Sequence, residues 1–463
     1  MKKIVALFAI LLIALTLCVP VGAVFDSGTV TAKLKSDVYY MESLDEDTAF
    51  FDRNSSKKVP AAAFVKILAA VTAIEKWPEL DEKVTVSEKN LSLVEYGYGI
   101  RTALYKAGEK VSKRELIDCL IVYSANDAAS IIAYEVSGSL DAFIKEMQAT
   151  AEKIGLTSTV VKNIHGFDEE GQYTTAKDIA RMLKYALNYP VFVEAFSASS
   201  VTLKKTSLNE ERTYNASNKM LNATISDYYH SSVTGGKQTM TDKAGECIAV
   251  VSSKDGYSYL TVVLGGKLTD VDKDGVDENT CMTDAKKMLN WVYENIRYRV
   301  VASPTQHVAM VEVVSGKGTD KLRLIPEKET SALVPANATT ASVLFEVVEG
   351  TVPAKVKAPV KAGDIIGQAN ILYAGQVLAK INIVAANDVS LSFTGLIMNT
   401  VRAVMTSWVF IILVALAAVG CIGYLLVSYN TYKKRERQKK AIQARIQRKQ
   451  AQQKKLEEMK VRK

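Results

Sequence analysis

Cysteine and histidine are scarce in this 463-residue chain, which contains five of the first and three of the second. Cys18 and Cys421 lie in apolar runs near the two ends, so a folded part holds only Cys119, Cys247 and Cys281. An odd number excludes a complete disulfide framework and leaves open both a single bridge and free buried thiols. Cys-x-x-Cys and His-Glu-x-x-His sequences are absent as well. We therefore expect no metal site and no cofactor.

A large excess of one charge sign is also absent from most of the chain. The net charge is +8, but residues 430–463 alone contain fourteen Lys or Arg and three Glu. A net charge of +11 in this tail leaves −3 for everything before it. The basicity is thus a property of the tail, which argues against a nucleic-acid-binding protein. Hydrophobic residues at 48% and charged residues at 23% favour globular domains with a membrane segment.

Two long apolar runs stand near the ends. Lys2 and Lys3 precede an apolar stretch over 4–19 and small residues at 21–23, a pattern typical of a signal peptide over residues 1–23. An uncleaved anchor helix is the alternative. The second run, 408–429, contains no charged residue and is long enough to cross a hydrocarbon core of about 30 Å.

The residues around the second run predict its orientation. Trp408 and Tyr429 flank it, as interfacial aromatic residues often do, and Lys433, Lys434 and Arg435 follow. The positive-inside rule then predicts a single-pass protein of the cell membrane with a cytoplasmic tail, 430–463, and an extracytoplasmic body. We expect the tail to be a solvated helix, with contact to anionic lipid headgroups as the alternative.

Periodicity divides the body into an α+β part and a β part. Helical patterns cover 61–75, 113–134 with a break at 124–126, 175–187 and 283–297, and extended patterns cover 37–42, 48–52, 247–252 and 260–264. Strands before and after the helices predict one sheet that joins both ends of this segment. From 298 onward short β-branched runs alternate with Gly and Pro, which predicts a small β domain. A linker over 390–405 has some amphipathic character.

Several stretches carry a resemblance to a known family. Penicillin-binding proteins and serine β-lactamases share Ser-x-x-Lys, Ser-x-Asn and Lys-Thr-Gly motifs, in that order. The segment 60–66, with Lys66, resembles the first motif, and Ser124-Ala125-Asn126 resembles the second. Segments 163–167, 173–178 and 218–221 are similar to further stretches of the serine D-alanyl-D-alanine carboxypeptidases, peptidase family S11. The segment 358–364 resembles the family's C-terminal module.

This resemblance implies an architecture with stated boundaries. A signal peptide (1–23) would precede a carboxypeptidase-like domain of the penicillin-binding-protein transpeptidase fold (24–297). A small all-β domain (298–388), a linker (389–407), one transmembrane helix (408–429) and a basic tail (430–463) would follow. The extra β domain and the anchor disfavour a β-lactamase.

In that family the motifs have defined chemical roles. A serine at a helix start attacks the D-Ala-D-Ala carbonyl, and a lysine one turn later takes its proton. The resemblance assigns the lysine role to Lys66 and the proton-relay and substrate-holding roles to Ser124 and Asn126. The third motif lies on a strand and holds the substrate carboxylate. An ungapped alignment places Lys237, Gln238 and Thr239 there as substrate-binding residues.

The sequence departs from this pattern at the decisive positions. Ala63 stands three residues before Lys66, where the nucleophilic serine belongs, and its methyl group forms no acyl-enzyme. Val65 replaces the usual threonine. Thr239 is β-branched where the third motif has glycine; a gapped alternative, 233–235, keeps Thr-Gly but loses the lysine. The first and third motifs, which are far apart in the sequence, have both lost required residues. Two such changes indicate natural divergence away from acyl transfer.

Two other serines, Ser55 and Ser124, are candidate substitutes for the missing nucleophile. Ser55 precedes Lys58 with the right spacing, but Pro60 follows and the helix begins later, so chance explains the match. Ser124 could act with Lys66 in an unusual geometry. The retained residues could equally be structural, with Lys66 paired to Asn126, and Ser124 and Asn126 holding a loop.

Three hypotheses follow. The leading one is a membrane-anchored pseudoenzyme of peptidoglycan metabolism that binds D-Ala-D-Ala stem peptides or a partner protein. The second is an active carboxypeptidase with an altered site that trims the terminal D-alanine. The third is a scaffold that acts through its β domain and tail.

Overall fold

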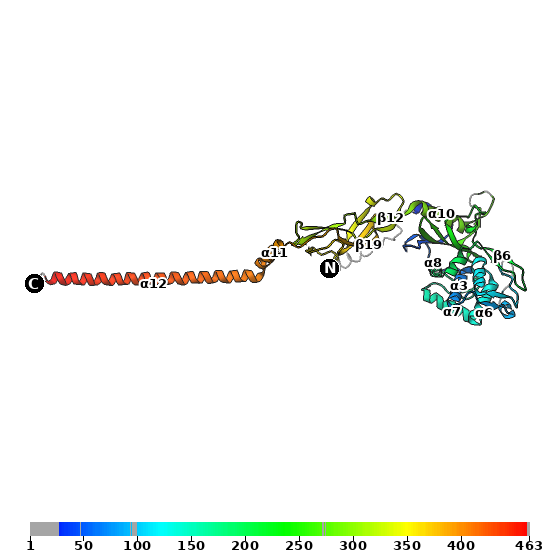
Figure 1. Cartoon of the computed structure of the whole chain (residues 1–463), viewed down its shortest axis with the longest axis horizontal. Coiled ribbons are helices and arrows are strands. Elements are labelled where there is room, and N and C mark those ends of the chain that lie inside the picture. The colour runs from blue at the N-terminus through cyan, green and yellow to red at the C-terminus, as the bar shows by residue number, and fades with distance from the viewer. Residues whose placement is uncertain are drawn as a thin grey trace, which may run out of the picture. The chain divides into compact units, whose positions relative to one another are not determined.

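The computed structural model describes residues 27–46, 48–92, 94, 100–270, 273 and 275–460. The predicted signal peptide lies outside this part of the chain. The structure divides into two compact units. The first contains the described residues up to Ala302 together with 329–345 and 370–380, and the second contains 303–328, 346–369 and the chain from Ile381 onward. Figure 1 gives the element labels used below.

The first unit is built on a five-stranded antiparallel sheet in the order β2-β1-β9-β8-β7. Its strands are β1 (Val38–Ser43), β2 (Ala49–Arg53), β7 (Val233–Thr241), β8 (Gly245–Lys254) and β9 (Tyr257–Gly266). The predicted sheet that joins both ends of the segment is confirmed. Asp255 and Gly256 both have positive φ, 55° and 86°, as the tight turn between β8 and β9 requires.

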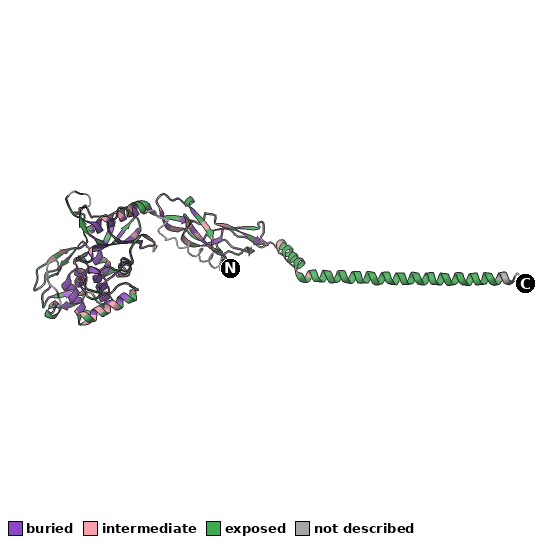
Figure 2. Ribbon diagram, turned by 180° about the vertical axis from the view of Figure 1, so that it is seen from behind, coloured by how far each residue is buried: buried purple, intermediate pink, exposed green. Residues whose placement is uncertain are grey.

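Both faces of this sheet are covered, which explains why β1 is buried at every position. Val38 and Tyr40 join the larger core, whereas Tyr39 and Met41 join the smaller one, because successive side chains of a strand point to opposite faces. The larger core includes residues of α3 (Val65–Lys76), α6 (Asn126–Ser137), α7 (Leu140–Ile154) and α8 (Ala176–Ala186). The smaller core includes residues of α10 (Thr280–Asn295) (Figure 1). Figure 2 shows the buried residues gathered along the sheet and these helices.

The helices follow the predicted pattern with shifted ends. The predicted helix over 61–75 begins as the 3-10 turn η2 (Ala62–Phe64) and continues as α3 (Val65–Lys76). The predicted break in the next helix is also found, between the π-helical turn η3 (Cys119–Tyr123) and α6 (Asn126–Ser137). Ser112 and Glu115 form a capping box at the start of α5 (Lys113–Asp118). The Thr175 side chain accepts a hydrogen bond from the Asp178 N–H and caps α8 (Ala176–Ala186).

The remaining helices and strands complete the first unit. The predicted closing helix is α10 (Thr280–Asn295), which starts earlier than expected because Asn279 accepts a hydrogen bond from the Met282 N–H and caps it. The remaining elements are α2 (Gly28–Thr31), β3 (Lys83–Thr85), α4 (Glu88–Ser92), β4 (Lys110–Ser112), α7 (Leu140–Ile154), α9 (Pro190–Ser197), β5 (Ser200–Leu203), β6 (Arg212–Asn215), η4 (Lys219–Leu221), β10 (Leu268–Thr269) and β11 (Glu278–Asn279).

The β-rich C-terminal part contains a six-stranded sheet in the order β16-β18-β19-β14-β13-β17 and the pair β12-β15. Its elements are β12 (Ile296–Ala302), β13 (Ala309–Val314), β14 (Lys321–Pro326), β15 (Thr330–Pro335), η5 (Thr340–Ser342), β16 (Val343–Val347), β17 (Lys355–Lys357), β18 (Ile365–Tyr373) and β19 (Gln376–Ala385). The prediction that this part of the chain is built of β-strands is confirmed.

The segment expected to be a linker with some amphipathic character contains a helix, α11 (Phe393–Thr406). Ser392 accepts a hydrogen bond from the Gly395 N–H, and this cap makes a helix start that the sequence reading overlooked. The next helix, α12 (Trp408–Lys460), runs through the apolar stretch and the basic tail without a break. Its described side chains are exposed, apart from the half-buried Phe410 (Figure 2). Among the described helices it alone has the length and composition to cross a membrane.

The thiols left open by the sequence are free in the structure. Cys119, Cys247 and Cys281 are all buried and none forms a disulfide. Burial raises the pKa of Cys119 and of Cys247 to about 12, so both are protonated near neutral pH.

Candidate functional site

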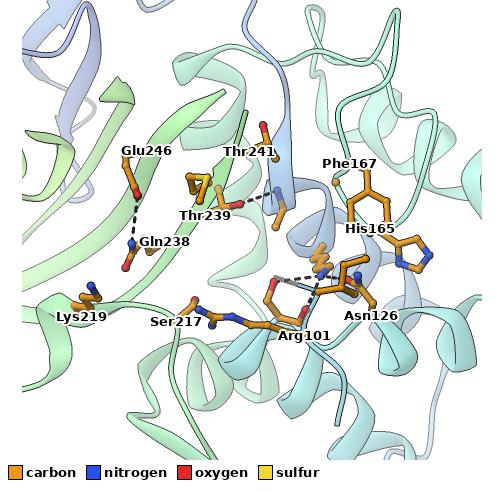
Figure 3. A pocket seen from close by; sticks show the side chains of 16 residues that line it. Arg101, Asn126, His165, Phe167, Ser217, Lys219, Gln238, Thr239, Thr241 and Glu246 are labelled. Atoms are coloured by element: carbon orange, nitrogen blue, oxygen red, sulfur yellow. Dashed lines mark hydrogen bonds between the residues drawn. The ribbon is translucent and has the colours of Figure 1, made fainter. Parts of the chain in front are cut away.

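A cavity of about 320 Å³ opens in the first unit where η2, the η3–α6 turn, the loop 163–167 and β7 meet (Figure 3). Its lining brings together residues that lie far apart in the sequence. They are Ala63, Lys66, Ile100, Arg101, Ser124, Asn126, His165, Gly166, Phe167, Ser217, Lys219, Gln238, Thr239, Met240, Thr241 and Glu246.

Lys66 is held in a fixed position at one side of this cavity. Its Nζ donates to the backbone O of Ser124 at 2.5 Å, to Ser124 Oγ at 3.3 Å and to Asn126 Oδ1 at 2.5 Å. The side chain is 3% exposed. Burial, and then the charges of Lys237 and Arg101, lower its pKa well below the usual lysine value. An amine with a lowered pKa can accept a proton, so this group suits a general base.

The backbone between η3 and α6 explains how Ser124 and Asn126 reach Lys66. Ser124 adopts a left-handed conformation, with φ at 69°, and this ends the π-helical turn. Ala125 is extended, and Asn126 opens α6. The Asn126 N–H donates to the backbone O of Arg101 at 2.8 Å, which fixes the loop. Such strained backbone occurs often at functional sites.

Ala63 lies at the start of the Lys66 helix and lines the cavity. Its backbone N–H donates to Thr239 Oγ1 at 3.1 Å (Figure 3). Val65 faces the other way, is 1% exposed and belongs to the larger core. The substitution by valine noted in the sequence therefore adds apolar packing and contributes nothing to the cavity.

The three residues expected to bind substrate occupy different environments on β7. Gln238 and Thr239 line the cavity, and Gln238 Nε2 donates to Glu246 Oε2 at 3.4 Å. Lys237 is not among the lining residues. Its side chain is fully buried, and Nζ donates to the backbone O of Ile121 at 3.1 Å. Burial and then the charge of Arg101 lower the pKa of Lys237 to about 7.

The gapped alternative at 233–235 is packed elsewhere. A side chain on Gly235 would meet the ring of Phe196 on α9, and neither Thr234 nor Gly235 lines the cavity. The Ser55 and Lys58 pair also lies outside the lining. Ser55 Oγ donates to Asp52 at 2.5 Å, and Lys58 Nζ lies 4.1 Å from the centre of the Tyr173 ring.

Several lining residues were missed by sequence reasoning. Arg101 follows a segment with no periodic pattern, and only its position in space shows that it belongs to the site. Its guanidinium lies 5.5 Å from the Tyr123 ring, and its side chain extends in the direction of Ser217 (Figure 3). Lys219 and Glu246 are the other charged residues missed. The cations Arg101 and Lys219 outnumber the one carboxylate, that of Glu246, so the cavity suits an anionic group.

Besides Gln238 Oε1, two polar atoms in the lining have no hydrogen-bond partner among the described residues. They are Ser217 Oγ and His165 Nδ1, and both side chains are more than nine-tenths buried. His165 lies on the side of the cavity opposite Gln238 and Glu246 (Figure 3). Buried polar atoms are normally paired, so these two are available to a ligand. No group of three or more metal-binding side chains occurs in the described part of the chain.

The burial of His165 predicts a pH effect on stability. Desolvation, and then the charge of Lys66, lower its pKa to about 3. Because the unfolded chain then binds more protons than the folded one between about pH 6.5 and pH 3, stability falls as the pH falls through this window. We expect the free energy of unfolding to fall by about 2 kcal/mol between pH 6.5 and pH 5 because of His165.

Chemical unfolding at these two pH values measures this cost. On acidification, the free energy of unfolding of a His165→Gln variant should fall by about 2 kcal/mol less than that of the natural chain. His307→Gln, at an exposed histidine, is the matched control and should follow the natural chain. Identical losses in all three proteins would contradict the assignment of a neutral buried imidazole.

The fold and the cavity together define the class of protein. An α+β domain with a buried Lys–Ser–Asn cluster beside a β-strand is the arrangement of the penicillin-binding-protein transpeptidase fold. A family model for D-alanyl-D-alanine carboxypeptidases, peptidase family S11, matches residues 31–268, just over half of the chain. A second model, for the C-terminal domain of penicillin-binding protein 5, matches residues 301–390. The chain therefore belongs to the D-alanyl-D-alanine carboxypeptidase family of peptidoglycan metabolism.

Individual relatives are distant. The chain is 24% identical to D-alanyl-D-alanine carboxypeptidase DacF of Bacillus subtilis, over 84% of this chain and 95% of the relative. It is 23% identical to DacA of Escherichia coli, over 65% and 70%. Among solved structures, penicillin-binding protein 5 from Haemophilus influenzae is similar with a TM-score of 0.56 and 20% identity, covering 77% of this chain and 98% of that one. Identity at this level supports the fold alone.

Proposed function

We propose that this chain is a membrane-anchored pseudoenzyme that binds D-Ala-D-Ala stem peptides of peptidoglycan without cleaving them. The observation that carries the proposal is Ala63, a methyl group beside an intact Lys66–Ser124–Asn126 cluster. A base with no nucleophile to activate leaves acyl transfer without its first step.

The site is also poorly suited to stabilise an oxyanion. Acyl transfer needs backbone N–H groups that point at the developing negative charge. The Ala63 N–H instead donates to Thr239 Oγ1, at 3.1 Å. This side chain both occupies the N–H and fills space beside it. Loss of one such donor lowers rates by about 10²–10³ in other enzymes, so this change alone weakens catalysis strongly.

Binding of a peptide requires fewer functional groups than its cleavage does. Arg101 and Lys219 supply positive charge for a terminal carboxylate, and Ser217 Oγ is an unpaired donor in the same lining. The cavity volume of about 320 Å³ is in the range of small-ligand sites. These features support the retention of peptide binding after the loss of cleavage.

A substitute nucleophile is the one specific alternative. Ser124 Oγ lies 3.3 Å from Lys66 Nζ, and Ser124 lines the cavity. A carboxypeptidase that attacks through Ser124 would form an adduct at this residue, which mass spectrometry of digested protein would locate.

A membrane location completes the proposal. The signal peptide (1–23), the carboxypeptidase-like domain (24–297), the β domain (298–388), the segment 389–407, the membrane span (408–429) and the cytoplasmic tail (430–463) form its parts. The apolar exposed surface of α12 favours a lipid environment, and Lys433, Lys434 and Arg435 favour a cytoplasmic end.

A truncation and a cysteine-labelling experiment test this arrangement. Removal of residues 408–463 should move the protein from the membrane fraction to the soluble extracytoplasmic fraction. A cysteine added after Lys463 in the full chain should react with an impermeant maleimide only after the cells are opened. Reaction in intact cells would contradict the orientation.

Peptide binding tests the function. We would titrate the full-length protein, in lipid nanodiscs, with Nα-acetyl-L-lysyl-D-alanyl-D-alanine and measure heat and released D-alanine. Saturable binding without release is the expected result, and the C-terminal amide of the same peptide should bind at least about tenfold more weakly because it lacks the carboxylate. Release of D-alanine would support the active alternative, and absence of binding would support a scaffold.

A further inference from the structure

The lysine that the third motif assigns to a substrate carboxylate is out of reach of a ligand. Lys237 is fully buried, does not line the Lys66 cavity, and donates through Nζ to the backbone O of Ile121 at 3.1 Å. The next residue on β7 leads to a carboxylate instead, because Gln238 Nε2 donates to Glu246 Oε2 at 3.4 Å and both side chains line the cavity. A terminal carboxylate of a ligand therefore needs a different cationic partner.

The two exposed cations in the lining differ in their surroundings. Lys219 lies on the same side of the cavity as Glu246 (Figure 3), and its Nζ is 5.9 Å from the centre of the Tyr228 ring. Arg101 extends in the direction of Ser217 (Figure 3), whose buried Oγ has no hydrogen-bond partner among the described residues. A guanidinium can donate two parallel hydrogen bonds to a carboxylate, and a nearby hydroxyl can add a third.

The Arg101 side chain contacts an aromatic pair that comes from two separate elements. Its guanidinium carbon lies 5.5 Å from the centre of the Tyr123 ring, and Nη1 donates to the backbone O of Tyr123 at 3.5 Å. Tyr123 in turn stacks on Tyr214 of β6, with ring centres 4.4 Å apart and 26° between the planes. Contact with an aromatic face restricts the guanidinium, so it loses less conformational freedom when it pairs with an anion.

Hydrogen bonds also fix the backbone that carries Arg101. The Asn126 N–H donates to the backbone O of Arg101 at 2.8 Å, and the Ala103 N–H donates to Asp127 Oδ1 at 2.8 Å. The Tyr214 hydroxyl donates to the backbone O of Ala103, also at 2.8 Å. Tyr214 therefore acts on Arg101 twice, through its ring on the side chain and through its hydroxyl on the backbone.

We propose that Arg101 binds the terminal carboxylate of the peptide in the Lys66 cavity, and that Tyr214 is a positioning residue that holds Arg101 there through Tyr123. This inference rests on the proposed function, because it assumes a peptide with a free carboxylate as the ligand. The carboxylate partner has moved from the third motif on β7 to the loop that precedes β4. An amide in place of the carboxylate would present donors to the donors of the guanidinium, which gives selectivity for the free acid.

The selectivity between a peptide acid and its amide measures the role of Arg101. Nα-acetyl-L-lysyl-D-alanyl-D-alanine and its C-terminal amide are titrated into the full-length protein in nanodiscs, and the ratio of the two affinities is compared among variants. Arg101→Gln should lower this ratio from at least about tenfold to about twofold or less. Arg101→Lys should restore only part of it, because an ammonium group lacks the planar fork.

A matched control and two outcomes make this test decisive. Arg53→Gln, at an exposed arginine outside the lining, removes the same charge from the first unit and should keep the ratio of the natural chain. A ratio near one in the natural chain, or an unchanged ratio in Arg101→Gln, would overturn this inference and leave peptide binding standing. If the natural chain binds neither peptide, the proposed function fails and this inference fails with it.

Variants of Tyr214 distinguish positioning from a purely structural role. Tyr214 is half-buried, so its variants should fold. Tyr214→Leu should lower the acid-to-amide ratio to about twofold, whereas Tyr214→Phe keeps the ring stack and should lower the ratio by no more than about twofold. In the Arg101→Gln background, Tyr214→Leu should change the ratio no further, because Tyr214 acts through Arg101. Equal weakening of both peptides by Tyr214→Leu, with an unchanged ratio, would contradict the positioning role.

Discussion

Ala63→Ser combined with Thr239→Gly is expected to convert this chain into one that reacts covalently with fluorescent penicillin. The serine hydroxyl would lie one helical turn from Lys66, which already has its partners in place. The glycine would release the Ala63 N–H from the threonine hydroxyl and open space for an oxyanion. Ala63→Ser alone should label at least about 10²-fold more slowly, since this donor remains occupied. The rate of gain of in-gel fluorescence measures the difference.

Two companion variants make the result specific. Ala63→Ser combined with Thr239→Val keeps the bulk of threonine without its hydroxyl, so it should stay unreactive if space is the obstacle. Addition of Lys66→Met to the reactive variant should abolish labelling, because the base is lost. If Ala63→Ser alone labels as fast as the double variant, the obstruction by Thr239 is not real.

Gly166→Ala is expected to destabilise the first unit by about 3 kcal/mol or more. Gly166 has φ of +88°, and a methyl group there would lie 2.2 Å from the backbone O of Ala62 and 2.6 Å from the backbone N of Ala63. These are backbone atoms at the start of the Lys66 helix, so they cannot move aside without moving the site. A lower melting temperature, by roughly 10 °C, is the expected readout.

The variant Gly138→Ala separates the effect of backbone strain from the effect of a steric clash. Gly138 also has positive φ, +73°, but a methyl group there would meet no atom within 4 Å. The free energy of unfolding of this variant should fall by only about 1 kcal/mol, which is the cost of placing a residue with a side chain in the left-handed conformation. Tryptophan fluorescence reports on the correct unit, because Trp77 and Trp291 belong to it. Equal losses in both variants would mean that the contact with Ala62 is not tight.

The sheet and the main helices were predictable because their signals are local. Alternation and β-branched runs marked β8 and β9, and the break at Ser124 was visible as a change of pattern. The early strands β1 and β2 were placed beside the late ones by a topological argument, and the pairing of β1 with β9 confirms it. The helix α11 was missed because its cap, Ser392, has many non-helical uses in a sequence.

The site was predictable only in part. Lys66, Ser124 and Asn126 stand in a pattern whose chemistry can be read directly, and they are hydrogen-bonded together as expected. Arg101 comes from a segment with no motif, whereas Lys219 lies in the family-like segment 218–221 without any sign there of a site role. Only folding brings the two side chains to the cavity. The contact between the Ala63 N–H and Thr239 joins residues 176 positions apart, so no local pattern announces it.

The central claim is that the natural chain forms no acyl-enzyme. The most direct measurement is the intact mass of the full-length natural protein, extracted from nanodiscs after exposure to excess benzylpenicillin. We expect an unchanged mass, because a methyl group stands where the nucleophile would be. An added mass equal to one penicilloyl group, at Ser124 or any other residue, would contradict it.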